Sequence, residues 1–238
     1  MSHVDPQVSV VVPCHGDAAP LARLAGDLAP SSGVEYIVSR TGPDDPDEAA
    51  LRTARPDLRW VDGPPGRGVQ LNSGAAVAAG RWLWFVHADS RLPAGWIDVF
   101  RDLDHAQPSV VGGSFTFRLD SPAWQARVIE RGVAWRVRWL GLPYGDQGLF
   151  VRRDVFIAMH GFAPWPLMED VEFVRRLTRR GRLVHLSQQV TTSARRWERD
   201  GWWRRNGANL VTLSGYFLGI RPERLARRYD RGTAVPRG

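Results

Sequence analysis

Short apolar runs alternate with amphipathic stretches along residues 8–90. Four apolar runs have the length and β-branched or aromatic content of buried strands: Val8–Pro13, Glu35–Ser39, Leu58–Val61 and Leu83–Val86. Helical periodicity lies between them, over Ala19–Leu28, Glu48–Thr53 and Val69–Ala79. Residues 40–48 and 63–68 are rich in Gly, Pro and Asp and predict loops. This alternation predicts a parallel sheet with helices on both faces.

The second half of the chain is less regular. Helical patterns cover Trp96–Leu103, Trp124–Trp139 and Glu169–Arg180, and strand patterns cover Val110–Arg118, Gly148–Val151 and Arg182–Leu186. From residue 200 onward, tryptophan, tyrosine and phenylalanine are interleaved with arginine. There is no internal repeat and no low-complexity linker, so we expect one domain over residues 1–238.

A carboxylate follows the fourth apolar run. Asp89 stands in Val86-His87-Ala88-Asp89-Ser90, where a buried strand gives way to a loop. Open α/β sheets bind ligands at the carboxyl ends of their strands. We therefore interpret Asp89 as the ligand of a divalent cation that carries a nucleotide diphosphate. The alternative is that Asp89 caps a turn or the next helix, and this stretch alone does not separate the two.

Charge is unevenly distributed along the chain. All 32 basic residues are arginine, and the net charge is +7. Residues 171–238 hold 16 arginines and five acids, a net of +11, which leaves −4 for residues 1–170. A nucleic-acid partner is therefore not expected, whereas a basic C-terminal third favours contact with a diphosphate or an anionic lipid. We interpret the use of arginine in place of lysine as an effect of genomic base composition, which does not account for the uneven distribution of charge.

The single cysteine, Cys14, excludes an intramolecular disulfide and a cysteine-based zinc site. No signal-peptide pattern opens the sequence, and no apolar run reaches the ~18 residues of a membrane span. These features lead us to expect a cytoplasmic protein, with peripheral contact at the inner membrane surface as a further option.

Three motifs occur in a characteristic order: Arg67-Gly68-Val69-Gln70-Leu71-Asn72, His87-Ala88-Asp89 and Met168-Glu169-Asp170-Val171-Glu172-Phe173. Together they resemble family-2 glycosyltransferases with a GT-A fold. The closest subgroup is that of the radical-SAM/selenodomain-associated, or arsenosugar-type, transferases. The resemblance covers most of the chain, from Val8 to about Trp197.

The resemblance implies a single GT-A domain with a Rossmann-like, mostly parallel central sheet, helices on both faces and a smaller acceptor-side half. It divides the chain into a nucleotide-binding half (1–92), an acceptor and catalytic half (93–200) and a basic aromatic tail (201–238). The implied activity is inverting transfer of a sugar from a nucleotide-diphosphate donor to a hydroxyl of a small-molecule or lipid-linked acceptor.

The resemblance also implies a divalent cation, Mn²⁺ or Mg²⁺, which would bridge the two donor phosphates and be held by a carboxylate. Relatives usually have Asp-x-Asp at this strand end, whereas this chain has His87-Ala88-Asp89. Asp89 is then the expected metal ligand, and one carboxylate is missing. Mn²⁺ tolerates imidazole better than Mg²⁺ does, which favours Mn²⁺. His87 contacts the ribose or, equally, is a buried histidine bonded to backbone.

Asp170 is the expected general base, because relatives use the aspartate of a Glu-Asp pair at a helix start to take the proton of the acceptor hydroxyl. Here Glu169-Asp170 follows a Trp-Pro-Leu-Met stretch, and a helix N-terminus would favour the ionised form. The alternative is an acidic first helical turn without a catalytic role.

The remaining expected contacts to the nucleotide sugar come from several segments. Arg67 is expected to reach a phosphate or a nucleobase carbonyl from a glycine-rich loop, unless it is a solvated loop residue. Ser193–Trp197 resembles a Gln-x-x-Arg-Trp motif, which assigns Arg196 to the leaving diphosphate and Trp197 to the acceptor. The other expected contacts are Pro13, His15, Asp17, Arg40, Gln70, Asn72, Asp146 and Gln147.

Arg40 departs from the pattern of relatives, and Asp146 and Gln147 have an alternative interpretation. Arg40 stands where relatives have an aspartate that bonds the nucleobase or ribose. A turn is the alternative for Asp146 and Gln147.

The tail (201–238) is expected either to lie at a membrane interface or to pack back on the domain. A non-catalytic partner protein that binds a nucleotide or a membrane is the alternative to a transferase, supported by the missing acids at His87 and Arg40.

Overall fold

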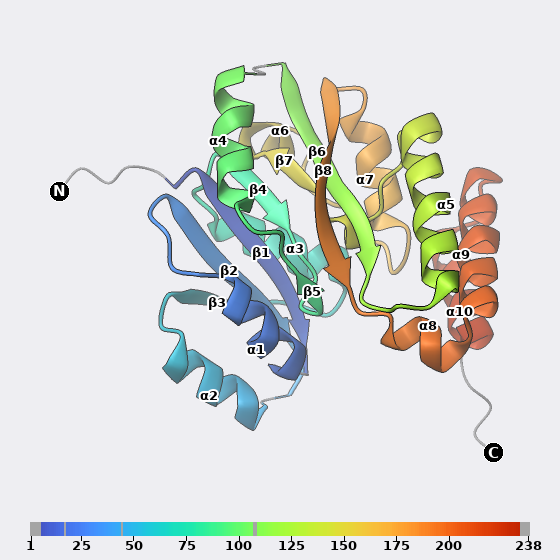
Figure 1. The fold of residues 1–238 in the computed structure, drawn as a ribbon, viewed down its shortest axis with the longest axis horizontal. Helices are drawn as coiled ribbons and strands as arrows, with labels where there is room; N and C mark the ends of the chain where they lie inside the picture. The colour runs from blue at the N-terminus through green and yellow to red at the C-terminus, as the bar shows by residue number, and fades with distance from the viewer. Residues whose placement is uncertain (1–5, 17, 44, 107–108, 234–238) are drawn as a thin grey trace.

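Eight strands form one sheet in the computed structural model, which describes residues 6–16, 18–43, 45–106 and 109–233 (Figure 1). The strand order is β3-β2-β1-β4-β7-β6-β8-β5. The strands are β1 (Val8–His15), β2 (Val34–Thr41), β3 (Leu58–Asp62), β4 (Trp82–Phe85), β5 (Ser90–Arg91), β6 (Val110–Leu119), β7 (Phe150–Arg152) and β8 (Arg182–Thr192). Asp17, one of the expected donor contacts, lies outside the described residues.

The sheet is parallel except at two strands. β1 pairs with β2 and β4 in parallel, β2 with β3, and β6 with β8. β7 runs antiparallel between β4 and β6, and the short β5 is antiparallel to β8. The carboxyl ends of β1 and β4 therefore lie at the same edge.

The helices are α1 (Ala18–Asp27), α2 (Pro46–Ala54), α3 (Arg67–Val77), α4 (Trp96–Ala106), α5 (Trp124–Leu140), α6 (Arg153–Ala158), α7 (Glu169–Leu177), α8 (Arg195–Asp200), α9 (Trp202–Phe217) and α10 (Pro222–Thr233), with a 3₁₀ turn, η1 (Gly145–Gln147). No helix among the described residues has the length and apolar character needed to cross a membrane.

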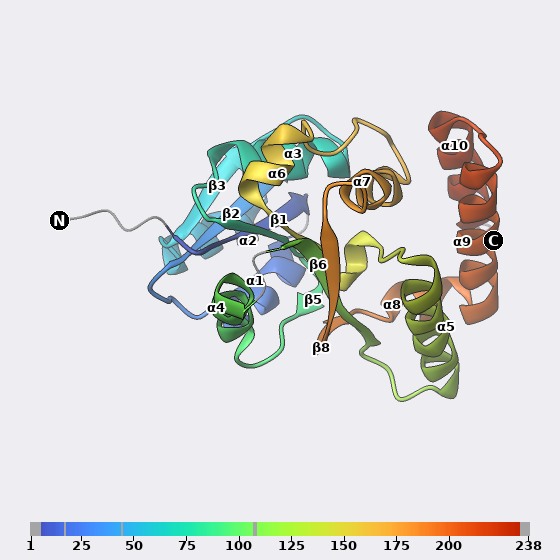
Figure 2. The same ribbon diagram turned by 90° about the horizontal axis from the view of Figure 1, so that it is seen from above.

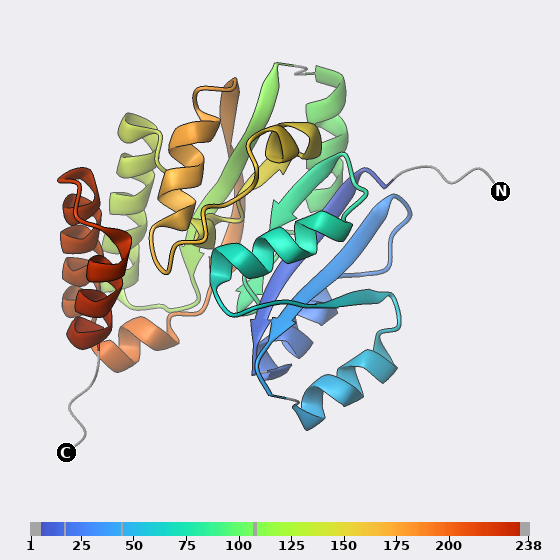
Figure 3. The same ribbon diagram turned by 180° about the vertical axis from the view of Figure 1, so that it is seen from behind.

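Alternating side chains of β1 divide the core into two layers. Val10 and Val12 pack with residues of α1 and α4, whereas Val11 packs with residues of α3, α6 and α7. Figure 2 shows these two groups of helices on opposite sides of the sheet, and Figure 3 shows α3 (teal) and α7 (orange) from their own side. The predicted mostly parallel sheet with helices on both faces is confirmed.

The C-terminal helices lie at the end of the molecule that is remote from β3. Phe117, Ile129 and Trp197 belong to a third apolar cluster that joins β6, α5 and α8. α9 and α10 form an antiparallel pair beside α5 (Figures 1 and 2). The tail therefore packs on the domain, while many of its large apolar side chains stay exposed.

Several local predictions were wrong for identifiable reasons. Residues 40–48 were predicted as a loop, but α2 begins within them at Pro46. It begins there because Asp45 caps the helix by accepting from the Asp47 N–H (2.9 Å), and because proline suits the first helical position. Arg67, predicted in a loop, is the first residue of α3. β8 continues to Thr192, past the predicted end at Leu186, because it keeps pairing with β6 after a register shift.

Candidate functional site

Two adjoining cavities lie at the carboxyl ends of β1 and β4. The strand-end cavity, of about 380 Å³, is lined on its own side by Pro13, His15, Pro20, Gln70, Ala88 and Arg195. The roofed cavity, of about 290 Å³, is covered by α9 and α10. Five residues line both cavities: Arg67, His87, Asp89, Ser193 and Arg196. Motifs that are far apart in the sequence therefore meet at one shared wall.

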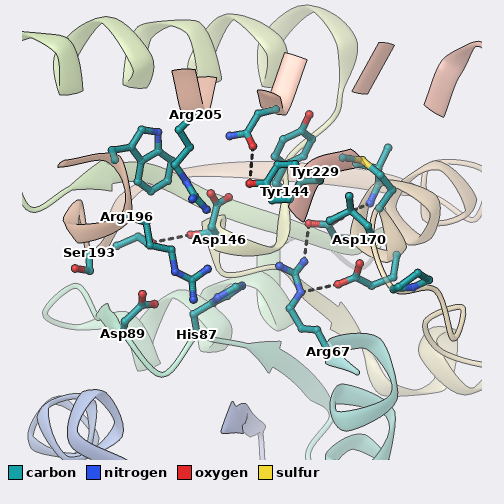
Figure 4. Close-up of a pocket in the computed structure, with 18 residues that line it drawn as sticks. Arg67, His87, Asp89, Tyr144, Asp146, Asp170, Ser193, Arg196, Arg205 and Tyr229 are labelled. Atoms are coloured by element: carbon teal, nitrogen blue, oxygen red, sulfur yellow. Dashed lines mark hydrogen bonds and ion pairs between the residues drawn. The ribbon is translucent and has the colours of Figure 1, made fainter. Parts of the chain in front are cut away.

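Arg67 is the centre of this wall. As the first residue of α3, it reaches across to the start of α7, where its Nε lies 2.6 Å from the Glu169 carboxylate and its second guanidinium nitrogen 2.7 Å from the Asp170 carboxylate (Figure 4). Burial by itself would lower the pKa of Arg67, but the two carboxylates raise it above its usual range. Arg67 is therefore a permanent cation, still one-third exposed.

Asp170 is held as a carboxylate by several donors. Its Oδ2 also accepts from the Gly145 N–H (2.8 Å), and its Oδ1 accepts from the Val171 N–H (2.8 Å). Burial alone would raise the pKa of Asp170, but Arg67 and these two amides hold it below its usual value. A Cβ at position 145 would stand 2.5 Å from the Arg67 guanidinium, so a side chain there would push Arg67 away from its present position beside Asp170.

Glu169 has the opposite shift. Its carboxyl is 4% exposed, and burial raises its pKa, with Asp170 adding to the rise and Arg67 opposing it. Both acids lie in the first turn of α7, where the helix dipole favours negative charge. Met168, the residue before them, has a φ of +66°, in the left-handed region. A strained residue therefore precedes the acid pair, as is common at functional sites.

Asp146 is a third acid on the roofed cavity. Its Oδ1 is buried and has no hydrogen-bond partner among the described residues. Burial raises the pKa of Asp146 to about 6, and the charge of Asp170 adds to this, whereas Arg136 and Arg67 oppose it. A buried acceptor without a donor is costly, so this oxygen is suited to bond a ligand hydroxyl.

His87 and Asp89 border both cavities just after β4. Burial lowers the pKa of His87 to about 3, and Arg67 and Arg196 act in the same direction, so the imidazole is neutral at physiological pH. No cluster of three His, Cys, Asp or Glu side chains suited to a metal is found among the described residues. One carboxylate still fits a cation that takes its other ligands from a diphosphate and water.

The roof of the second cavity comes from the tail. Arg205 and Asn209, one turn apart on α9, line it together with Tyr229 of α10. The Tyr229 hydroxyl donates to Asn209 Oδ1 (2.9 Å), and the Arg205 guanidinium pairs with Asp200 (2.7 Å) and lies over Trp197. Sequence reasoning missed these three roof residues, since they form no motif and their i, i+4 spacing is an ordinary helical one.

Trp197, Arg196 and Asp146 were predicted contacts, and all line the roofed cavity. Pro13, His15 and Gln70 line the strand-end cavity. The Gln70 amide also donates to the Cys14 and Ser39 carbonyls (2.8 and 3.1 Å), which ties α3 to β1 and β2.

Three predicted contacts line neither cavity as the described residues define them. The Arg40 guanidinium is bound by the Glu48 and Asp62 carboxylates (3.0 and 3.2 Å). Asn72 bonds the Phe162 backbone at both its amide atoms, each at 2.9 Å. Gln147 accepts from the Tyr144 N–H (3.0 Å) inside η1. All three side chains therefore make contacts that stabilise the fold. Their binding to a donor stays a prediction.

Comparison with known proteins bears on the family and the fold. Residues 9–164 match the family model Glycosyl transferase family 2. The solved mannosyltransferase PcManGT from Pyrobaculum calidifontis, in complex with GDP-Man and Mn²⁺, has a TM-score of 0.65 at 18% identity, over 88% of this chain and 63% of that one. S. aureus TarS 1-349 in complex with UDP-GlcNAc has a TM-score of 0.59 at 15% identity, over 79% and 58%.

The chain thus spans less than two thirds of the length of these two structures. At such identities the likeness shows the fold alone, and it confirms the predicted GT-A fold. No curated protein matches the chain.

Proposed function

The chain belongs to glycosyl transferase family 2, and on that premise we propose that it transfers a sugar from a nucleotide-diphosphate donor to an acceptor hydroxyl. One observation carries the proposal: two cavities meet at Arg67, the first lined by three arginines and one carboxylate and the second by three arginines and four carboxylates. The donor diphosphate would occupy the strand-end cavity, between Arg67, Arg195 and Arg196. The acceptor would occupy the roofed cavity, beside Asp146 and Asp170.

We propose inverting chemistry with Asp170 as the base. The acceptor oxygen would attack the anomeric carbon from the face opposite the diphosphate and form the new C–O bond. Its proton would pass to Asp170 as the bond to the diphosphate oxygen breaks, and the electron pair would leave with the diphosphate. Arg67 and Arg196 would stabilise the charge on that leaving group. Asp146, which lines the same cavity and has a buried carboxylate oxygen without a hydrogen-bond partner among the described residues, would bond a hydroxyl of the sugar or acceptor.

A divalent cation, Mn²⁺ or Mg²⁺, is part of the proposal. Asp89 would hold it, with neutral His87 beside it, and the bound cation would supply positive charge to the diphosphate. PcManGT was solved in complex with GDP-Man and Mn²⁺, which supports the use of a cation with a nucleotide sugar in this fold. TarS 1-349 was solved in complex with UDP and with UDP-GlcNAc, so guanosine and uridine carriers are both candidates.

The acceptor side of the proposal is broader. We propose a small-molecule or lipid-linked hydroxyl acceptor, in a cytoplasmic enzyme that contacts the inner membrane surface through its basic tail (201–238). The arsenosugar-type subgroup, the division into a nucleotide-binding half (1–92) and an acceptor half (93–200), and the single-domain organisation belong to the same proposal. The described strands support the last point, because they form one continuous sheet.

A panel of nucleotides tests the proposal. Thermal unfolding is measured with UDP-, GDP- and dTDP-sugars, each with Mn²⁺, Mg²⁺ or EDTA, and hydrolysis of each sugar is followed by release of the nucleoside diphosphate. We expect one base to raise the unfolding temperature most, more strongly with a cation, and that donor to be hydrolysed slowly. The absence of any shift across the panel would refute donor binding.

The same panel separates the enzyme from its alternative. A non-catalytic nucleotide-binding protein would show the thermal shift with no hydrolysis and no transfer to any hydroxyl. The single carboxylate at the end of β4, where relatives have two, is the observation that favours this alternative.

A further inference from the structure

A stripe of exposed tryptophans runs along the outer side of α5. Trp124, Trp135, Trp139 and Leu140 are 52–66% exposed, although side chains of this kind are usually covered. Their helical spacing places the tryptophans along one side. Arg131 and Arg138 lie among them and are also exposed.

The charge on this side of α5 has one sign. Glu130 is the only acid in the α5 sequence. Its carboxylate is 10% exposed and pairs with Arg118 (3.0 Å) and Arg127 (2.9 Å). The outer surface of α5 therefore presents indoles and guanidinium groups without a carboxylate of its own.

α9 continues this surface. Trp203 and Leu210 are 52% and 57% exposed, and the Trp203 ring lies 5.7 Å from the Trp124 ring, centroid to centroid. Both views show α5 beside α9 (Figures 1 and 2). We call the joint surface the tryptophan face: Trp124, Trp135, Trp139, Leu140, Trp203 and Leu210.

α9 thus has two different sides. Arg205 and Asn209 line the roofed cavity, while Trp203 and Leu210 lie on the opposite side of the same helix. The sequence of α9 contains no acid. Leu210 also borders an apolar groove of about 290 Å³ whose other wall includes Arg228 of α10. Arg224, Arg227 and Arg228 of α10 are exposed, as is Arg221 just before this helix.

We propose that the tryptophan face binds the surface of a bilayer that carries anionic headgroups. Tryptophan favours the boundary between hydrocarbon and water because its ring is apolar and its N–H is polar. Exposed arginines around the rings add attraction to acidic lipids. A second copy of the chain fits less well, because its arginines would meet those of the first.

This inference deepens the proposed membrane contact, which rested on the tail alone, by adding α5. Its biological meaning rests on the proposed function: docking would set the roof of the acceptor cavity one helix thickness away from the lipid. A lipid-linked hydroxyl is the acceptor class that such a position suits.

The test is flotation of the full chain with vesicles of phosphatidylcholine, with and without phosphatidylglycerol. We expect binding to the mixed vesicles, with a blue shift of tryptophan fluorescence, and weaker binding at high salt. The partition coefficient of the double variant Trp135→Ser/Trp139→Ser onto vesicles should fall at least ~tenfold. Each indole ring that enters the bilayer interface removes apolar area from water, and the variant loses that contribution to binding. Arg131→Gln/Arg138→Gln should reduce the preference for phosphatidylglycerol.

Ile157→Ser is the matched control, because Ile157 is 55% exposed on α6, outside the tryptophan face. It should bind vesicles as the wild type does. Failure of the wild type to float with mixed vesicles, or equal binding by the double tryptophan variant, would overturn the inference. So would a dimer in light scattering that the double variant abolishes.

Nucleotide binding is measured on the same proteins. The double tryptophan variant should keep the nucleotide-induced thermal shift of the wild type, which also shows that it is folded. Vesicle binding without any nucleotide shift would refute the proposed function and leave the docking surface standing. A nucleotide shift without vesicle binding would do the reverse.

Discussion

The two cavities share one wall and differ in charge. The residues that line only the strand-end cavity, among those described, include Arg195 and no carboxylate. The charged residues that line only the roofed cavity are Asp146, Glu169, Asp170 and a single arginine, Arg205. A diphosphate is repelled by carboxylates and attracted by guanidinium groups, whereas a proton acceptor must be a carboxylate or similar base. Arg67 therefore lies between two electrostatic environments, lining both cavities while its two ion pairs are with acids of the roofed one.

The largest expected effect removes the base from the roofed cavity. Asp170→Asn should lower hydrolysis or transfer by ~10²–10⁴-fold, because the amide cannot take the acceptor proton. The nucleotide-induced thermal shift should be retained, since the strand-end cavity is unchanged. Glu172→Gln is the matched control, as Glu172 is another acid of the first turn of α7 and pairs with Arg176. Loss of nucleotide binding in Asp170→Asn would instead assign Asp170 a structural role.

Removing the shared cation should disturb both cavities. Arg67→Met should cost about 10²-fold in kcat/KM at neutral pH, since the leaving diphosphate loses a preorganised charge. Without that positive charge the pKa of Asp170 rises, so the acidic limb of the kcat/KM profile should move to higher pH. Arg67→Lys should shift the limb less. An unchanged limb in Arg67→Met would show that another group is the base.

A smaller effect is expected on the strand-end side alone. Asp89→Asn should weaken the cation-dependent part of nucleotide binding by on the order of tenfold. The part that persists in EDTA should remain, because Arg195 and Arg196 still face the diphosphate. Titrations of nucleotide with Mn²⁺ and with EDTA measure both parts. Equal losses in the two conditions would contradict a role in metal binding.

The smallest expected effect is on stability, at Asp146. The folded pKa of about 6 lies above the ordinary 3.8, so the fold loses stability as the pH rises from 3.8 to about 6, and the full cost of the ionised carboxylate is present above that. Asp146→Asn should therefore raise the unfolding temperature by ~3 °C at pH 7.5. The gain should shrink as the pH falls from about 6 and disappear below 3.8, where the wild-type carboxyl is protonated in both the folded and the unfolded state. Equal gains at both pH values would contradict the raised pKa.

Sequence reasoning predicted the strand-end side of the site better than the roofed side. Buried strands such as β1 and β4 show as apolar runs, and a residue that follows such a run must lie at the edge of the sheet. His87 and Asp89 could be placed in that way. Arg67 and Asp170 were found through motifs, but their ion pair joins residues that are 103 positions apart, which no local pattern specifies.

The missed residues depend on docking between distant helices. Arg205, Asn209 and Tyr229 reach the site because α9 and α10 pack beside α5 and α8, and no local pattern distinguishes them from ordinary helix residues. Arg40 was expected to face a donor because it stands at a strand end. The sequence could not show that Glu48, at the start of a predicted helix, would bind its guanidinium.

The roof has a consequence for synthesis of the chain. α9 and α10 follow all eight described strands in the sequence, so a ribosome delivers them after the sheet. Domains fold as their segments emerge, and the wall that surrounds the diphosphate side can assemble while the cover of the other side is still being translated. A nascent chain would thus be able to hold a nucleotide before it has an enclosed place for the second substrate.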